Sequence, residues 1–292
     1  MSWSSLDIPD LTGQTFVVTG ANGGLGTVIT RVLAQKNAKV LMACRNTDSA
    51  QRIADGLIGD VEVRKLDLSD LTSIREFARS IENFDVLVNN AGVMNVPFGR
   101  TADGFETQFG VNHLGHFALT GLLLDKIADR VVTLSSIAHG HTPKLWIDDL
   151  NYEGRRYQRN LAYAQSKLAN LMFARELNRR FEASDRPLRS YGVHPGVSGT
   201  DLFTRTETIA DRFAKMGASL AGHPPENAAE SALFAATTTD ADPEVFWGPT
   251  GGITQSRGPV RAARSSKLSK DAVMWRRLWD KSQLMTGVTY SV

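Results

Sequence analysis

The sequence predicts one α/β domain built on a doubly wound parallel sheet, and three observations support this fold class. Short apolar segments alternate along the chain with longer segments of helical periodicity. The first apolar segment leads directly into a glycine-rich turn and a helical pattern. No change in composition and no low-complexity run marks a boundary, so residues 1–292 are expected to form a single domain.

Six segments rich in Val, Leu or Ile are too short for helices and are predicted to be strands. In chain order they are Thr15–Thr19, Lys39–Ala43, Val61–Leu66, Val86–Asn89, Arg130–Leu134 and Arg189–Val193. Helical patterns lie between them at about Leu25–Lys36, Leu71–Ile81, Gly104–Ala128 and Tyr163–Phe181. This alternation has the spacing of right-handed βαβ crossovers, so the sheet is expected to be of the Rossmann type.

Two segments interrupt the alternation. They are a long connection, residues 137–160, and a segment rich in Gly, Pro and Thr, residues 195–225. Both would lie beyond the carboxyl ends of strands, where open α/β sheets bind ligands. We therefore expect both to be substrate loops, with residues 195–225 closing as a lid. Residues 257–292 form a basic tail with eight Lys or Arg against two Asp or Glu.

Composition excludes several classes of function. The 33 basic and 31 acidic side chains nearly cancel, which argues against a protein that binds nucleic acid. The single cysteine, Cys44, excludes an intrachain disulfide and fits a reducing compartment. No run of about 18 apolar residues and no apolar leader is found, so we expect no integral membrane segment and a cytoplasmic location.

The glycine-rich turn is the first candidate binding site. The sequence from Thr19 reads Thr-Gly-Ala-Asn-Gly-Gly-Leu-Gly between a strand and a helix. Glycines let the backbone approach a pyrophosphate, which the N–H groups and the positive end of the helix would stabilise. The residues predicted to contact the cofactor here are Gly20, Asn22, Gly24, Leu25 and Gly26. The spacing differs from the commoner G-x-G-x-x-G, so a purely structural turn remains the alternative.

The next predicted strand ends about 20 residues further on, where NAD-binding sites carry an acidic residue. That position holds Arg45. A guanidinium accepts no hydrogen bond from ribose hydroxyls, but its planar fork suits a 2′-phosphate. The cofactor is therefore expected to be NADP(H), with NAD(H) as the lesser alternative. A solvated surface arginine is the other interpretation of Arg45.

Polar or small residues follow the third and fourth predicted strands. Asp67 and Leu68 follow the third, where Asp67 would hydrogen-bond an adenine amino group. Asn89 ends the fourth, and Ala91 and Gly92 would let a ring or a ribose lie flat against the backbone. All five are predicted to bind the cofactor, although each would also be ordinary in a turn.

The candidate catalytic pair is Tyr163 and Lys167, which lie four residues apart and hence on one face of a helix. A nearby ammonium favours the phenolate, so we expect the Tyr163 pKa to fall from its usual value of about 10. Tyr163 would then be a proton donor and acceptor near neutral pH. Ser136 ends the preceding strand, where its hydroxyl would polarise a carbonyl, although a helix or turn cap explains it equally well.

These motifs together resemble the short-chain dehydrogenases/reductases. The glycine turn, Asn-Asn-Ala-Gly, Ser136, the Tyr163/Lys167 pair and His194-Pro195-Gly196 occur in that family's order. The resemblance covers the chain from about Leu11 to its end. Cys44-Arg45, the wide gap between Ser136 and Tyr163, and Ser166-Lys167-Leu-Ala-Asn resemble the branch of the retinol dehydrogenases.

The resemblance implies a catalytic tetrad of Asn112, Ser136, Tyr163 and Lys167. In that family Tyr is the acid/base, Lys also binds the nicotinamide ribose, Ser holds the substrate oxygen and Asn positions a proton-relay water. It also implies that Pro195, Gly196 and Thr200 bind the cofactor, with Thr200 at the nicotinamide carboxamide. Family habit further suggests a homodimer that pairs through the Tyr163 helix.

We therefore expect an NADP(H)-dependent oxidoreductase that acts on a small-molecule carbonyl or alcohol. Apolar Trp146, Leu202 and Phe203 suggest a hydrophobic substrate. No metal is expected, because no carboxylate or cysteine cluster accompanies the pairs His113/His116 and His139/His141. One alternative is a non-catalytic NADP(H)-binding redox sensor, and another is an interaction protein built around the basic tail.

Overall fold

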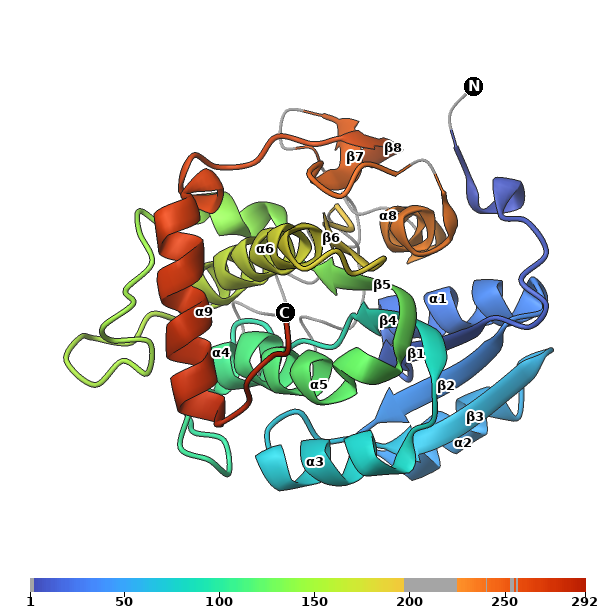
Figure 1. The fold of residues 1–292 in the computed structure, drawn as a ribbon, viewed down its shortest axis with the longest axis horizontal. Helices are drawn as coiled ribbons and strands as arrows, with labels where there is room; N and C mark the ends of the chain where they lie inside the picture. Colours follow the sequence, from blue (N-terminus) through green and yellow to red (C-terminus); the bar gives the residue numbers. More distant parts are fainter. Residues whose placement is uncertain (1–2, 197–224, 240, 253–254, 256) are drawn as a thin grey trace, which may run out of the picture.

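Figure 1 shows the computed structural model, which describes residues 3–196, 225–239, 241–252, 255 and 257–292. Within these residues eight strands form one sheet in the order β3-β2-β1-β4-β5-β6-β7-β8. Neighbouring strands are parallel except β7 and β8, which are antiparallel. The bounds are β1 Thr15–Thr19, β2 Lys39–Cys44, β3 Asp60–Lys65, β4 Phe84–Asn89, β5 Ile127–Leu134, β6 Arg189–Val193, β7 Trp247–Gly251 and β8 Arg257–Ala262.

Helices follow most of the strands. The α-helices are α1 Gly24–Gln35, α2 Thr47–Ala54, α3 Leu71–Ser80, α4 Thr107–Phe109, α5 Gly115–Leu123, α6 Arg159–Ala183, α8 Pro225–Thr237 and α9 Ala272–Thr286. A π-helix, η2 Gly110–Leu114, joins α4 to α5. Short 3₁₀ segments are η1 Ser5–Asp7, η3 Leu124–Lys126, η4 Ile137–His141 and η6 Leu268–Lys270. None of the described helices is long and apolar enough to cross a membrane.

Alternate residues of each central strand face two apolar clusters. In β1, Phe16 and Val18 pack in the cluster beside α1 and α8, whereas Val17 packs in the cluster beside α3, α5 and α6. Helices therefore cover both faces of the sheet, as the apolar composition of the strands requires. The turns that follow the parallel strands meet at their carboxyl ends.

The predicted Rossmann-type fold and its six strands are confirmed, and Thr15–Thr19 and Arg189–Val193 have the predicted bounds. The prediction of a single helix over Gly104–Ala128 is wrong. That segment contains α4, the π-helix, α5 and η3, and β5 already begins at Ile127. Apolar residues continue the helical pattern up to Ile127, and an apolar run alone does not distinguish a helix from a strand.

Helix α6 is covered on nearly all sides. From Ala162 to Asn178 every residue except Arg175 is buried. Part of this cover is α9, whose Trp279 ring stacks on Phe173 with centroids 6.0 Å apart. The basic tail is thus part of the domain. The chain's own α9 occupies a face of the Tyr163 helix, so pairing of two chains through that helix, as family habit suggested, is not supported.

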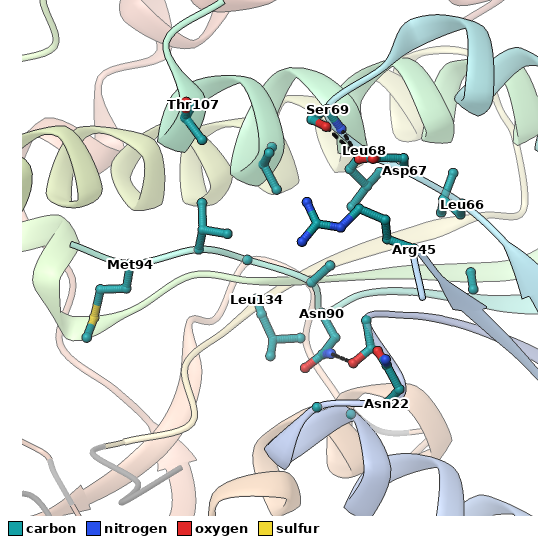
Figure 2. Close-up of a pocket in the computed structure, with 18 of the residues that line it drawn as sticks. Asn22, Arg45, Leu66, Asp67, Leu68, Ser69, Asn90, Met94, Thr107 and Leu134 are labelled. Atoms are coloured by element: carbon teal, nitrogen blue, oxygen red, sulfur yellow. Dashed lines mark hydrogen bonds between the residues drawn. The ribbon is translucent and has the colours of Figure 1, made fainter. Parts of the chain in front are cut away.

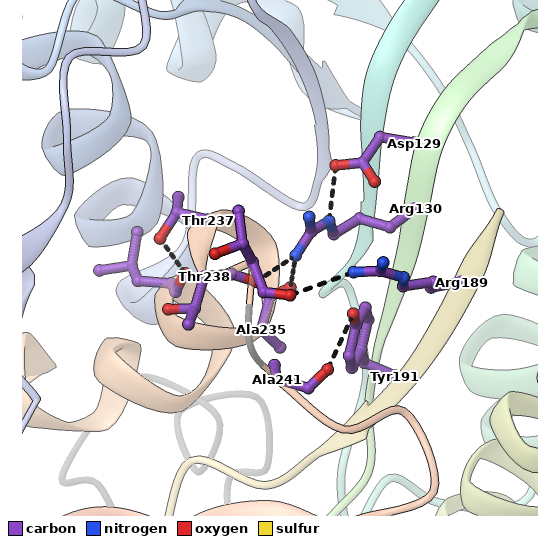
Figure 3. A network of polar contacts seen from close by, with 10 residues as sticks. Asp129, Arg130, Arg189, Tyr191, Ala235, Thr237, Thr238 and Ala241 are labelled. Carbon is purple, nitrogen blue, oxygen red and sulfur yellow. Dashed lines mark hydrogen bonds and ion pairs between the residues drawn. The ribbon is translucent and has the colours of Figure 1, made fainter. Parts of the chain in front are cut away.

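Helix α8 is fixed to the sheet by two arginines of β5 and β6 (Figure 3). Arg130 Nη1 donates to the carbonyl oxygens of Ala235 at 3.1 Å and Thr238 at 2.7 Å, at the end of the helix. Arg189 Nη1 donates to the next carbonyl, that of Thr239, at 3.1 Å. Cations at a helix C-terminus pair with its free carbonyls and its dipole. This holds the end of α8 against the sheet.

Candidate active site

A cavity of about 810 Å³ lies at the carboxyl ends of β1 to β6, within the size range of small-molecule sites. Its wall combines residues from turns that are far apart in the sequence. The predicted site residues that line it are Gly20, Asn22, Gly24, Leu25, Gly26, Arg45, Asp67, Leu68, Ala91, Gly92, Tyr163, Lys167 and Pro195. The fold thus gathers most of the predicted cofactor residues and two of the predicted catalytic residues at one place.

The glycine turn is closely packed against the turn after β4. Gly20 has a φ of +63°, and a Cβ there would lie 3.0 Å from the Cα of Ala91. A Cβ at Gly26 would lie 2.8 Å from Asn90 Nδ2 and would collide with the carbonyl oxygen of Gly20. Helix α1 begins after Gly23, which offers no side-chain cap to the first N–H groups. The turn therefore presents backbone to the cavity, as a pyrophosphate site requires.

Arg45 follows β2 and is exposed at the cavity wall. Figure 2 shows its guanidinium pointing into the cavity between Leu68 and Asn90. Within the described residues it forms no hydrogen bond and no ion pair. The next residue, Asn46, caps α2 by accepting from Ser49 N at 3.0 Å, so a helix N-terminus lies beside the arginine. Both features suit an anionic group.

The structure separates two neighbouring asparagines. Asn89, which was predicted to bind the cofactor, is fully buried, and its Nδ2 donates to Thr120 Oγ1 at 3.1 Å. Its side chain therefore does not reach the cavity. Asn90 lines the cavity instead and donates to the Thr19 carbonyl oxygen at 2.7 Å. Successive strand residues face opposite sides. That alternation indicates that the two side chains diverge, but it does not tell which of them faces the cavity.

Asp67 lines the cavity after β3, and one carboxylate oxygen already has local partners. Its Oδ1 accepts from the backbone N–H of Ser69 at 2.9 Å and from its hydroxyl at 2.6 Å. These bonds fix the turn that carries Leu68 (Figure 2). Asp67 is therefore both an ordinary turn residue and part of the cavity wall.

Ser136, Tyr163 and Lys167 meet at the end of β5. The Ser136 hydroxyl lies near enough to the Tyr163 phenol to favour the phenolate, and it accepts from Ala138 N at 3.1 Å, as an N-cap does. Ser136 is not among the residues that line the cavity. Lys167 Nζ lies 5.8 Å from the centre of the Tyr163 ring and donates to the Leu134 carbonyl oxygen at 3.1 Å. The interpretation of Ser136 as a cap therefore holds, and its role as a partner of the catalytic pair stays a prediction.

Asn112 lies behind the cavity wall, in the π-helix. Its side-chain amide hydrogen-bonds both backbone groups of Val93: Oδ1 accepts from Val93 N at 2.8 Å, and Nδ2 donates to Val93 O at 2.9 Å. A Cβ at Gly92 would lie 3.2 Å from Asn112 Oδ1 and 3.5 Å from Lys167 Nζ. Gly92 is thus where Asn112 and Lys167 come close. Single π-helical turns occur frequently at functional sites.

The protonation of the catalytic pair differs from the prediction. Burial raises the Tyr163 pKa to about 12, an effect that the Ser136 hydrogen bond opposes only in part. Burial also lowers the Lys167 pKa to about 8. The expected fall of the tyrosine pKa is therefore wrong, because the loss of water around the phenolate outweighs an ammonium directed at the Leu134 carbonyl. Near neutral pH the phenol carries its proton.

The cavity is walled by a segment that the sequence did not single out. Val93, Met94 and Val96 line it, and none of residues 137–160 does. Met94 is labelled in Figure 2. The long connection instead buries Leu145, Ile147 and Leu150 in a cluster with α6 and α9. Its length alone gave no indication of which way its apolar side chains face. Trp146 lies at a separate, smaller cavity beside α9.

The end of β6 is described only in part. Pro195 lines the cavity, while Gly196, with a φ of +78°, donates its N–H to His194 Nδ1 at 3.2 Å and does not line it. Thr200, Leu202 and Phe203 lie outside the described residues, as does most of the proposed lid.

Comparison with known proteins identifies the family. Residues 14–147 match the model of the short chain dehydrogenases. Over 298 aligned residues the chain is 38% identical to human Retinol dehydrogenase 13, covering 94% of this chain and 85% of that protein. The chain is a short-chain dehydrogenase of the retinol dehydrogenase-like branch. It is thus an oxidoreductase of a family that binds nicotinamide cofactors.

A further relative and two solved structures match this short-chain dehydrogenase. Human Retinol dehydrogenase 12 is 46% identical over 212 residues, covering 68% of this chain and 66% of that protein. A crystal structure of a protein from Mycobacterium paratuberculosis matches with a TM-score of 0.87 at 42% identity, covering 100% of both chains. A short chain dehydrogenase/reductase from Burkholderia phymatum in complex with NAD matches with a TM-score of 0.62, over 77% of this chain and 86% of that one. At 19% identity this structural match shows the fold alone.

Proposed function

We propose that the protein is an NADP(H)-dependent oxidoreductase that interconverts a carbonyl compound and an alcohol, with Tyr163 as the acid/base. The observation that carries the proposal is the meeting of Tyr163 and Lys167 with the glycine turn and Arg45 at one cavity. A protein that only binds a dinucleotide needs no buried proton donor at that place. The alternative of a non-catalytic redox sensor is therefore less well supported.

The proton chemistry follows from the side chains. The nicotinamide, when bound, supplies or accepts the hydride. In the reducing direction the neutral Tyr163 phenol donates its proton to the substrate oxygen, which Ser136 holds, and the carbon takes the hydride. The Lys167 ammonium, mostly protonated below a pKa of about 8, favours the phenolate that remains. Reversal of these steps oxidises an alcohol.

The preference for NADP(H) is supported by Arg45 and by the N-terminus of α2 beside it. Arg45, which has no partner among the described residues, suits the 2′-phosphate. The position directly after β2, where an acid would accept from ribose hydroxyls, holds this arginine, and the first acidic residue beyond it is Asp48 in α2. The glycine turn, in which Gly20 and Gly26 leave the backbone open to the cavity, supports binding of the pyrophosphate there. These residues fit the dinucleotide, and Asn112, fixed to Val93, would position a water of the proton relay.

A hydrophobic alcohol or carbonyl compound is the substrate class we propose. Val93, Met94 and Val96 present apolar side chains to the cavity. The relatives named retinol dehydrogenases support the same class by name. The interaction-protein alternative gains no support, because the basic tail is packed on its own domain.

The proposal is tested by following nicotinamide absorbance while NADPH is mixed with aliphatic, aromatic and polyene aldehydes and ketones. We expect turnover with at least one apolar aldehyde, and little with small polar ones. Tight NADPH binding without turnover of any compound, and without turnover of the matching alcohols with NADP⁺, would favour the redox sensor instead.

A further inference from the structure

A buried histidine joins three parts of the active site that lie far apart in the sequence. His116 of α5 is 1% exposed and does not line the cavity. Its Nδ1 lies 3.0 Å from the carbonyl oxygen of Asn112 in the π-helix. Its Nε2 lies 2.9 Å from Oγ1 of Thr19, the last residue before the glycine turn. One ring thus bridges the π-helix and the end of β1.

The hydrogen-bond partners indicate where the protons of this bridge lie. A carbonyl oxygen only accepts, so Nδ1 carries the hydrogen and donates to Asn112. Burial lowers the His116 pKa to about 4, and the positive charge of Lys167 acts in the same direction. The ring is therefore neutral near pH 7, and Nε2 is an acceptor. The Thr19 hydroxyl is placed to donate to Nε2.

Thr19 extends the bridge to the turn after β4. Its hydroxyl oxygen accepts from the backbone N–H of Ala91 at 2.9 Å. It also accepts at 3.0 Å from the N–H of Asn90, which is shared with the Val88 carbonyl oxygen at 2.9 Å. The carbonyl of Val88, at 3.4 Å, is a longer alternative for the hydroxyl proton. That choice would leave the lone pairs of Thr19 and His116 facing each other at 2.9 Å. The bond to His116 is therefore the favoured one.

We propose that His116 is a positioning residue that, through Thr19, fixes the Ala91–Gly92 backbone relative to Asn112. The inference rests on the proposed function, because Ala91 and Gly92 line the proposed cofactor part of the cavity. His116 itself does not line the cavity, so it would act through Thr19 and Asn112. It sets the distance between the backbone that packs on the dinucleotide and the helix that carries Asn112.

Two variants interrupt the bridge at its two ends. Thr19→Val removes the hydroxyl with little change in shape, and His116→Phe keeps a ring without hydrogen-bonding nitrogens. Each leaves buried polar groups without a partner, so the dissociation constant for NADPH should rise by at least about 10-fold. Thr19→Ser keeps the hydroxyl and should restore affinity to within about 3-fold of the parent.

Thr30→Val is the matched control. Thr30 of α1 is fully buried, and its hydroxyl has no partner within the described residues. The same chemical change there should leave NADPH affinity unchanged. If His116→Phe does not fold, Thr19→Val and Thr19→Ser still decide, because they act on the same bridge.

A second measurement needs no cofactor. The amide hydrogen of Ala91 should exchange faster in ligand-free Thr19→Val and His116→Phe than in the parent, and at the parent rate in Thr30→Val. Parent-like exchange together with parent-like NADPH affinity in the two bridge variants would overturn the role of His116. A parent that binds no dinucleotide would contradict the proposed function, while the exchange rates would still decide the positioning role.

Discussion

Tyr163 and Lys167 owe their chemistry to burial, and burial is the property that sequence spacing does not contain. The interval of four residues predicts a shared helix face, which the structure has. The same interval also predicted a lowered tyrosine pKa, whereas enclosure of both side chains moves the pKa of Tyr163 up and that of Lys167 down. The place of the glycines, Arg45 and the catalytic pair at one cavity was predictable, because residue type and position after a strand indicate it.

Lys167→Met should stabilise the fold. The folded pKa of Lys167, about 8, lies below the usual 10.5, so the unfolded chain binds this proton more tightly and the buried ammonium costs folding free energy below pH 8. The variant should gain up to about 3 kcal/mol in the free energy of unfolding at pH 7, reduced by the lost hydrogen bond to Leu134. Turnover should fall.

Urea unfolding at pH 7 and pH 10 tests the sign of this effect. The cost of the ammonium disappears as the pH rises from about 8 to 10.5, so the advantage of the variant should shrink over that interval. A gap in stability that is the same at both pH values would contradict the buried, destabilising Lys167.

Arg45→Asp should reverse the cofactor preference. A charge-assisted contact with the 2′-phosphate is worth about 1.5–3 kcal/mol, so the parent should prefer NADPH over NADH by roughly 10- to 150-fold. The carboxylate would repel the phosphate and accept from ribose hydroxyls. Dissociation constants for both cofactors measure the preference.

Arg52→Asp is the control, because it makes the same charge change on α2 at an exposed position away from the cavity. It should leave the ratio of the NADPH and NADH dissociation constants unchanged. Equal affinities in the parent would reject the role of Arg45.

At the scale of elements, the alternation of strands and helices was readable because each strand is a short apolar run. The elements that escaped prediction are those whose residues give mixed signals. Strands β7 and β8 contain Gly and Pro, which are depleted in strands, and β8 lies at the sheet edge where Pro is tolerated. The direction of the long connection, residues 137–160, depends on contacts with α6 and α9 that no local pattern encodes.

Helix α8 should depend on the Arg130 anchor (Figure 3). Arg130 is 5% exposed and also pairs with Asp129 Oδ2 at 2.7 Å. Arg130→Met would leave the buried carbonyl of Ala235 without this donor, at a cost of about 2–4 kcal/mol in urea unfolding. Arg189→Met, on the neighbouring strand, removes one exposed hydrogen bond and should cost less than about 1 kcal/mol. Equal losses in the two variants would contradict an anchor centred on Arg130.

Over the whole molecule, the last helix completes the core instead of extending from it. Trp279 of α9 is 2% exposed and packs on Phe117 with ring centroids 5.2 Å apart, and Arg180 of α6 lies over its face. A face of the Tyr163 helix, which family habit suggested for pairing, is therefore occupied by an intramolecular contact. Sequence patterns show that a helix is apolar on many sides but not which element covers each side.

Trp279→Ala should accordingly destabilise the entire domain. The loss of a buried indole ring costs about 3–5 kcal/mol, and the opened α6 surface should promote self-association. Urea unfolding and light scattering measure the two effects. Leu284→Ala, at a 77% exposed position of the same helix, should change stability by less than about 0.5 kcal/mol. A tail that unfolds without affecting the rest would show that α9 is not part of the core.

The central claim is that Tyr163 gives and takes the proton at this cavity. Tyr163→Phe removes the hydroxyl and keeps the ring, so the most direct measurement compares the single-turnover rate of NADPH oxidation by an apolar aldehyde in the parent and the variant. The rate should fall by at least about 10²-fold while the dissociation constant for NADPH changes by less than a few-fold. A rate within a few-fold of the parent would contradict the assignment of Tyr163 as the acid/base.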